Sequence, residues 1–237
     1  MLKKRIIATL LTDGMGNCVK PTGFCRPYRM CGPLIQHVKV MNARNIDELI
    51  IIDINAAKED RSPYFDAINS FTDEAFMPVV IGGGISSIES VDILIRYCGA
   101  DKVLLGRGIN DPLLVANIAG KYGEQAIVAA LDLEVNYCPD KITVLNNLPI
   151  GEVIVTAKWK EHTYTGYDLD SIRYATRHLN VPVVANGGCG EPKHMVQAFD
   201  AGADGAASGS MFMFTKYTPA DCSKWIRKHS GHKVRPI

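Results

Sequence analysis

The sequence predicts a (β/α)₈ barrel, a closed parallel sheet surrounded by helices, and three observations support this. Short apolar runs alternate with longer amphipathic segments along the 237 residues, as in parallel strands joined by crossover helices. Most apolar runs are continuous, as expected for strands covered on both faces. A glycine-rich motif also occurs once in each half. Because no linker-like stretch divides the chain, we expect one barrel domain over residues 1–237.

Each predicted strand is a short run dominated by Ile, Val, Leu or Ala, and most runs precede a helix-compatible segment. Helix starts carry caps such as Ser86 and Asp111-Pro112. The strands are predicted at 5–11, 49–54, 78–81, 102–105, 126–132, 152–157, 181–185 and 205–208. The helices are predicted at 32–44, 64–71, 87–97, 113–122, 169–178, 192–201 and 221–229.

Internal repetition indicates that the barrel is built from two half-barrels. In each half a strand ends in consecutive glycines, a helix follows, and Gly-Ala-Asp precedes a strand that ends in a second glycine turn. Gly83 and Gly187 lie 104 positions apart, and Asp101 and Asp204 lie 103 apart. The matched offset makes chance similarity a poor explanation.

The repeated glycine turns predict two phosphate sites. Glycines after a strand let the backbone approach an anion closely, and in a barrel they lie at the carboxyl ends of the strands, where active sites form. Two facing sites predict a ligand with a phosphate at each end, although such glycines can also serve only to make tight turns. The first site comprises Gly83, Gly84, Gly106 and Arg107, and the second comprises Gly187, Gly188, Gly209 and Ser210.

Composition narrows the function classes. A net charge of +1 gives no bulk electrostatic reason to expect nucleic acid or a membrane as partner. The first apolar run stops at Thr12, too early for a signal peptide or a spanning helix, and with no C-x-x-C motif this favours a reduced cytoplasmic protein. We expect no cofactor and no metal. A metal site among loop cysteines is the alternative, and the candidates are Cys18, Cys25, Cys31, Cys138 and Cys189.

Further motifs follow in a fixed order: MLKKRIIA at 1–8, IDEL at 46–49, GGGI at 82–85, DKV at 101–103, AALD at 129–132, TGYD at 165–168 and AGAD at 201–204. In this order they resemble HisF, the cyclase subunit of the imidazole glycerol phosphate synthase family, over nearly the whole chain. The resemblance implies a (β/α)₈ barrel and a glutaminase partner of the HisH type at the amino-terminal face of the barrel. It also implies that ammonia passes through the barrel to the opposite face.

The resemblance further implies two catalytic aspartates, at the ends of the first and fifth strands, for acid–base chemistry. The fifth-strand aspartate is present as Asp132, whereas Leu11 stands at the first-strand position. Asp13 shares the strand face of Leu11 but lies further up, in the loop. The family's acidic turn after the sixth strand is replaced by residues that include Glu161, so Asp13 or Glu161 is the candidate replacement for the missing acid.

Four charged residues stand at the amino-terminal starts of the first, second, fourth and sixth strands. These strand ends converge at the barrel floor, where two cations and two anions can pair. The resemblance implies a charged ring through which ammonia enters, and the alternative is a purely structural plug. The four residues are Arg5, Glu48, Lys102 and Glu152.

Three other polar residues have two interpretations each. Asp53 and Arg61 either contact the ligand, or Asp53 caps its own loop. His162 lies in a polar loop and is expected to be exposed to solvent rather than catalytic.

Three functions remain open. The first is a variant ammonia-channelling subunit, because relatives with leucine at the first aspartate are associated with acetamidino modification of bacterial surface sugars by a separate sugar amidotransferase. The second is the ordinary cyclase of histidine biosynthesis, a lyase that makes imidazole glycerol phosphate. The third is a non-catalytic regulator that binds a phosphorylated small molecule.

Overall fold

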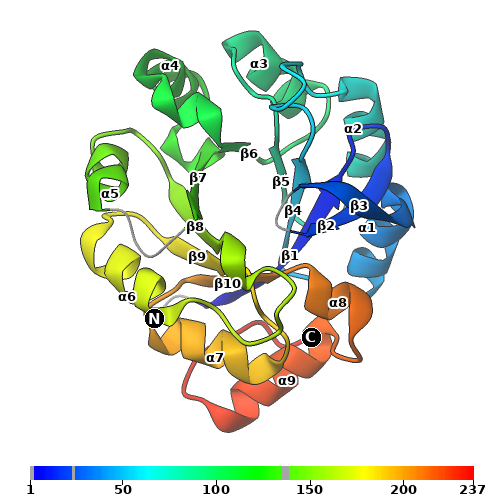
Figure 1. The fold of residues 1–237 in the computed structure, drawn as a ribbon, viewed down its shortest axis with the longest axis vertical. Coiled ribbons are helices and arrows are strands. Elements are labelled where there is room, and N and C mark those ends of the chain that lie inside the picture. The colour runs from blue at the N-terminus through cyan, green and yellow to red at the C-terminus, as the bar shows by residue number, and fades with distance from the viewer. Residues whose placement is uncertain (1–2, 23–24, 135–138) are drawn as a thin grey trace.

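Eight parallel strands close into a barrel with helices around its outside, which confirms the predicted fold class (Figure 1). The computed structural model describes residues 3–22, 25–134 and 139–237. The sheet closes because β1 pairs in parallel with both β4 and β10. The barrel strands are β1 (Arg5–Thr12), β4 (Glu48–Asp53), β5 (Val79–Gly82), β6 (Lys102–Leu105), β7 (Ile127–Leu133), β8 (Glu152–Ala157), β9 (Val183–Asn186) and β10 (Gly205–Ser208).

The helices follow the strands as predicted, with two additions. Asp111 caps α4, as predicted, but α3 is capped by Ser87 and not by Ser86. Helices α5 and α8 were not predicted, because α5 mixes β-branched and polar residues and α8 is little more than one turn. The helices are α1 (Leu34–Ala43), α2 (Phe65–Thr72), α3 (Ile88–Arg96), α4 (Pro112–Tyr122), α5 (Pro139–Asn146), α6 (Leu169–His178), α7 (Pro192–Asp200), α8 (Ser210–Phe214) and α9 (Pro219–His229). Short 3₁₀ turns lie at η1 (Arg107–Asn110), η2 (Glu124–Ala126) and η3 (Lys158–Lys160).

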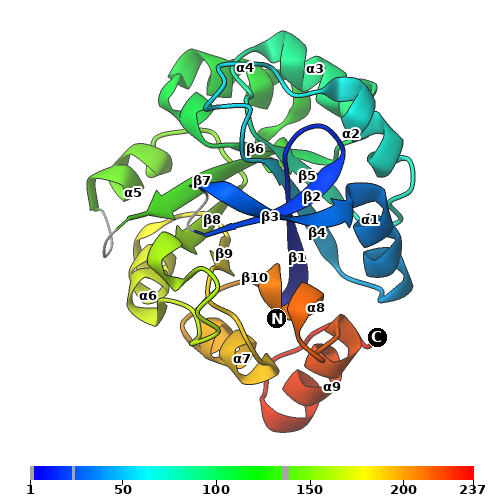
Figure 2. The same ribbon diagram turned by 45° about the vertical axis from the view of Figure 1, so that its right-hand side comes forward.

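An antiparallel hairpin, β2 (Asn17–Thr22) and β3 (Cys25–Pro33), interrupts the path from β1 to α1. This segment was predicted as a loop followed by a helix from residue 32, and that prediction was wrong. Pro33 ends β3 in an extended conformation, so the helix starts at Leu34. Figure 2 shows the hairpin lying across the barrel, over its carboxyl end.

Side chains inside the barrel form layers, because alternate residues of each strand face the lumen. Charged side chains form the floor. Above them one apolar residue from each barrel strand fills the lumen, and polar side chains of β1, β8 and β9 lie above that layer. The apolar layer consists of Ile7, Ile50, Val80, Leu104, Val128, Ile154, Val184 and Ala207. A larger apolar core lies between the strands and the helices.

The repeated Gly-Ala-Asp motif has the same role in both halves. Asp101 accepts a hydrogen bond from the backbone N–H of Val79 at 2.8 Å, and its own N–H donates to the Val79 carbonyl at 2.9 Å. Asp204 makes the same two bonds with Val183, at 3.3 and 2.8 Å. The aspartate therefore ties the start of one strand to the start of its neighbour.

We expect Asp101→Ala to lower the free energy of unfolding by about 1–3 kcal/mol, because it leaves the N–H of the buried Val79 without its acceptor. Asp101→Asn keeps an acceptor oxygen and should retain most of the stability. The control Asp73→Ala, at the end of α2, should change stability by less than about 0.5 kcal/mol. Urea unfolding measures all three. Equal effects of Asp101→Ala and Asp73→Ala would contradict this role.

Candidate functional site

Two cavities of very different size open at the carboxyl ends of the strands. The larger has a volume of about 620 Å³ and the smaller about 20 Å³. The larger is lined by all four residues of the first predicted phosphate site, Gly83, Gly84, Gly106 and Arg107. The smaller is lined by all four of the second, Gly187, Gly188, Gly209 and Ser210. Each predicted set is thus brought together, and phosphate binding itself stays a prediction.

The two glycine turns approach neighbouring backbone in the same way. Gly83 has φ +108°, and a Cβ on it would collide with the carbonyl oxygen of Asp53. Gly188 has φ +94°, and a Cβ there would collide with the carbonyl oxygen of Gly166. Glycine is required at both positions because the backbone has a positive φ there and a second loop packs directly against it.

Asp53 and Arg61 form one wall of the larger cavity. The Asp53 carboxylate accepts the backbone N–H of Asn55 at 3.0 Å and of Ala56 at 3.1 Å. It also accepts two bonds from the Arg61 guanidinium, at 2.8 and 3.2 Å, and that guanidinium stacks on Tyr64 at 4.0 Å. Asp53 therefore caps its own loop and orients Arg61 at the cavity wall.

Asp132 ends β7 and lines the larger cavity. Its side chain is 46% exposed, and Lys158 Nζ lies 4.0 Å from Oδ2. Partial removal from water raises the pKa of Asp132, and the Lys158 charge opposes this effect. Asp132 is thus an acid–base candidate with a cation beside it.

Leu11 and Asp13 supply no second carboxylate to this cavity. Leu11 is 3% exposed and packs against Val19 and Ile54. The Asp13 carboxylate accepts the N–H of Met15 at 2.9 Å and the side-chain amide of Asn17 at 2.8 Å. These bonds hold it within the turn between β1 and β2.

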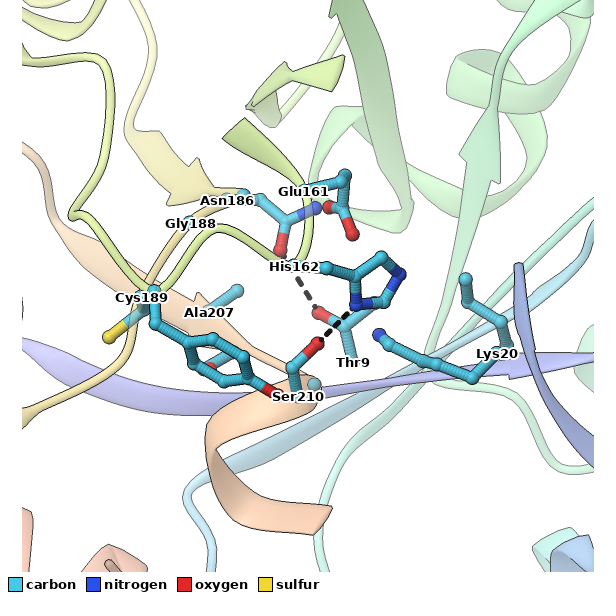
Figure 3. A pocket seen from close by; sticks show the side chains of 14 residues that line it. Thr9, Lys20, Glu161, His162, Asn186, Gly188, Cys189, Ala207 and Ser210 are labelled. Carbon is cyan, nitrogen blue, oxygen red and sulfur yellow. Dashed lines mark hydrogen bonds between the residues drawn. The ribbon is translucent and has the colours of Figure 1, made fainter. Parts of the chain in front are cut away.

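Three ionisable side chains, Lys20, Glu161 and His162, line the smaller cavity, and Figure 3 shows them around Thr9. Lys20 comes from the hairpin, and Glu161 and His162 come from the loop after β8. Burial lowers the pKa of Lys20 and raises the pKa of Glu161, and the nearby Asp132 charge raises the Glu161 pKa further. His162 Nδ1 lies 3.0 Å from Ser210 Oγ, and His162 is partly buried rather than fully exposed, while its expected lack of a catalytic role stays a prediction.

The four charged residues of the floor form a closed square of ion pairs. Arg5 contacts Glu48 at 2.6 Å and also pairs with Glu152. Lys102 contacts Glu48 at 2.8 Å and Glu152 at 3.2 Å. Every cation therefore pairs with both anions.

Comparison with known proteins identifies the family. The sequence pattern of the family described as histidine biosynthesis protein matches residues 6–218. The chain belongs to this family. Its relatives include HisF, a subunit of imidazole glycerol phosphate synthase, from Chlorobium chlorochromatii strain CaD3, which is 32% identical over 255 residues that cover 99% of this chain and 100% of the relative.

Two other relatives align over nearly the whole of both chains. HisF from Thermotoga sp. strain RQ2 is 32% identical over 253 residues, covering 99% of this chain and 98% of the relative. A Campylobacter jejuni protein, named as a candidate imidazole glycerol phosphate synthase subunit hisF2, is 33% identical over 251 residues and covers 99% of each chain. The chain is therefore HisF-like, as its motifs implied.

In this HisF-like chain a line of polar side chains crosses the top of the lumen. Thr9 donates to Asn186 at 3.5 Å, and Asn186 donates to Thr156 at 3.2 Å. Thr156 in turn hydrogen-bonds to Asp132, which favours the charged form of that carboxylate. The apolar layer of the lumen is thus capped by groups that can both donate and accept hydrogen bonds.

Sequence reasoning missed Lys20 and Lys158. Lys20 lies on a strand that was not predicted, so nothing in the local pattern placed it near Glu161. Lys158 was not singled out, although it directly follows a predicted strand at the end where active sites form.

Two further sequence expectations concern metals and membranes. Cys18 and Cys31 lie in β2 and β3 and not in loops. Cys138 and the side chain of Cys25 fall outside the described residues. Within the described ranges, no three His, Cys, Asp or Glu side chains are arranged to hold a metal ion.

No helix in the described part of the chain combines the length and apolar character needed to cross a bilayer.

We expect the carboxyls of Asp132 and Glu161 to titrate above the ordinary values of about 3.9 and 4.3. Asp132→Asn removes a negative charge and should lower the pKa of Glu161, whereas Lys20→Met removes a cation and should raise it. Carbon-detected NMR titration of the carboxyl groups measures both.

Because the folded state holds these protons more tightly than the unfolded state, each group's contribution to stability should fall as pH rises from the unfolded to the folded pKa. The control Glu134→Gln should lower the pKa of Asp132, where the Glu134 charge acts, and leave that of Glu161 unchanged. If the pKa of Glu161 were the same in all three variants, the two carboxyls would not share one electrostatic site.

Proposed function

We propose that this HisF-like chain receives ammonia from a HisH-like glutaminase docked at its amino-terminal face and delivers it through the barrel to the upper cavity. The observation that carries the proposal is the closed square of Arg5, Glu48, Lys102 and Glu152 directly below the lumen. It lies on the axis along which a small neutral molecule would enter.

The square is costly as a merely structural device. Glu48 and Glu152 are only 3% and 6% exposed, and buried ion pairs commonly add no more stability than apolar side chains of similar size. A charged floor that can open by exchanging partners supports an entry function. Each cation has two anions to choose between, so one contact can break without stranding a charge.

The layers above the floor suit ammonia in its neutral form. An ammonium ion would lose its hydration in the apolar layer, at a high cost in free energy, whereas neutral ammonia would lose much less. Thr9, Thr156 and Asn186 then offer hydrogen-bonding partners at the upper end. The path would end beside Asp132 in the larger cavity.

In this proposal, the molecule that accepts the ammonia is not the substrate of the ordinary cyclase. Leucine at position 11 cannot transfer a proton, and the Asp13 carboxylate is held in its turn. We therefore propose that the ammonia serves amidation of a surface-polysaccharide sugar by a separate sugar amidotransferase in the cytoplasm. The relative from Campylobacter jejuni named hisF2 is compatible with a second, specialised member of this family.

A second candidate function is imidazole glycerol phosphate synthesis itself, with Glu161 in place of the first aspartate. One observation favours it. Burial raises the pKa of both carboxyls, and the Asp132 charge raises the pKa of Glu161 further, so the two groups are near enough to interact. In this case Asp132 and Glu161 would share the proton transfers.

Glu152→Gln should uncouple glutamine consumption from amidation, because it breaks two sides of the ion-pair square. In a reaction reconstituted from glutaminase, this chain and the sugar amidotransferase, the amidated sugar formed per glutamine consumed should fall severalfold. The variant should also lose about 3–5 kcal/mol of stability, so folding is verified by circular dichroism. Lys121→Met, which breaks the surface pair with Asp92, is the matched control and should leave the ratio unchanged. A normal ratio in the folded Glu152→Gln variant would reject the conduit.

A direct assay separates the two candidate functions. The purified protein is incubated with the bisphosphate substrate of the cyclase and excess ammonium salt, and substrate loss is followed spectroscopically. We expect turnover about 10²–10⁴-fold below that of an ordinary HisF assayed alongside, because one positioned acid is missing. Turnover near the ordinary rate that is lost in Glu161→Gln would instead establish the cyclase. Tight binding of the substrate with no turnover, together with unchanged coupling in the preceding experiment, would indicate a regulator.

A further inference from the structure

The two glycine turns that repeat in sequence differ in the space above them. The larger cavity, above Gly83, Gly84 and Gly106, has about 620 Å³, which suits a small-molecule ligand. The smaller one, above Gly187, Gly188 and Gly209, has about 20 Å³. A single water needs at least roughly 10–15 Å³, so the second turn has room for about one water and not for a phosphate group.

Side chains of this chain fill the second turn. The His162 ring lies over it, with Nδ1 3.0 Å from Ser210 Oγ (Figure 3). Lys20 and Glu161 close its sides, because a Cβ placed on Gly209 would lie 3.2 Å from Lys20 Nζ and one placed on Gly187 would lie 3.5 Å from Glu161 Oε1. An incoming phosphate would have to displace the ring, and the Glu161 carboxylate offsets the Lys20 charge that would otherwise attract it.

The loop that carries His162 is fastened down on both sides of the second turn. The Gly166 N–H donates to the Gly188 carbonyl at 2.9 Å. Tyr164 packs so closely on Gly190 that a Cβ there would lie 2.6 Å from the Tyr164 Cβ. His162 itself adopts φ +63°, a conformation that histidine tolerates better than most residues, and this directs the chain back over Ser210. His162 is therefore held in place by the loop around it.

We propose that His162 is a specificity determinant that closes the second turn, so that the chain binds a ligand with one phosphate and not two. The phosphate lies at Gly83, Gly84 and Gly106, where Arg107 supplies a positive charge at the cavity. The rest of the ligand extends toward Asp132 and Lys158, at the upper end of the lumen.

The ligand class follows from these groups. One end carries a phosphate monoester or a phosphate of similar charge, and the other end is polar and uncharged, since it faces both the Asp132 carboxylate and the Lys158 ammonium group. The substrate of the ordinary cyclase carries a phosphate at each end, so the closed second turn favours the first proposed function over the second.

Phosphate titration of the isotope-labelled protein tests this inference. Inorganic phosphate is added while backbone amide shifts are followed by NMR. In the wild type, shifts should be confined to the amides of Gly84 and Gly106. In His162→Gly, the amides of Gly188 and Ser210 should shift as well, because the ring that lies over the second turn and its contact with Ser210 are removed.

Two more variants sharpen the result. His162→Asn tolerates the same backbone conformation with a shorter side chain, and at a given phosphate concentration it should give smaller shifts at Gly188 and Ser210 than His162→Gly. The control His178→Ala, an exposed histidine on α6, should behave as the wild type. Equal phosphate shifts at Gly188 and Ser210 in the wild type and in His162→Gly would overturn the inference, and so would their absence in the folded His162→Gly variant.

The inference rests on the proposed binding of phosphate at the glycine turns and not on ammonia transfer. The titration needs no glutaminase and no acceptor. Its failure therefore leaves ammonia delivery untouched, and a failure of the coupling experiment leaves the phosphate result untouched.

Discussion

The ion-pair square at the barrel floor is the constraint on which the interior of this protein depends. Arg5, Glu48, Lys102 and Glu152 come from four strands, and each side chain contacts two others of opposite charge. Removing one member would leave a buried charge uncompensated, which is far more costly than losing a surface pair. Because strand side chains alternate, facing these four residues inward also sets which residues face inward above them. The apolar layer and the polar layer of the lumen follow from that register.

Above the lumen the two-fold repeat is no longer symmetric. The Gly-Ala-Asp turns make equivalent hydrogen bonds in both halves, and in both glycine turns an added Cβ would collide with a neighbouring loop. The loops themselves differ. The Asp53–Arg61 pair stands at the side of the first turn and leaves a large cavity open, whereas Glu161, His162 and the hairpin residue Lys20 fill the space over the second. A repeated backbone therefore carries two unlike sites.

The charges at the upper face balance across the two cavities. Asp132 has Lys158 beside it, and Glu161 has Lys20, so each carboxylate that burial would neutralise has a cation that favours its charged form. Burial in turn lowers the pKa of Lys20. Burial thus raises the pKa of both carboxyls, and the neighbouring cations limit that rise.

Local sequence pattern was sufficient for the barrel, for its eight strands and for the two glycine turns, because strand periodicity, glycine placement and repeat spacing are short-range properties that the chain carries at every step. It was also sufficient to bring Arg5, Glu48, Lys102 and Glu152 together, since parallel strands in a barrel must start at one end. The sequence pattern could not show that the Asp13 carboxylate accepts hydrogen bonds within its own turn. It also could not show that the hairpin places Lys20 near Glu161, or that His162 closes one of the two glycine turns. Those outcomes were decided by tertiary structure, because they depend on where long loops settle when packed against each other, and contacts between residues far apart in sequence leave no local periodic signal.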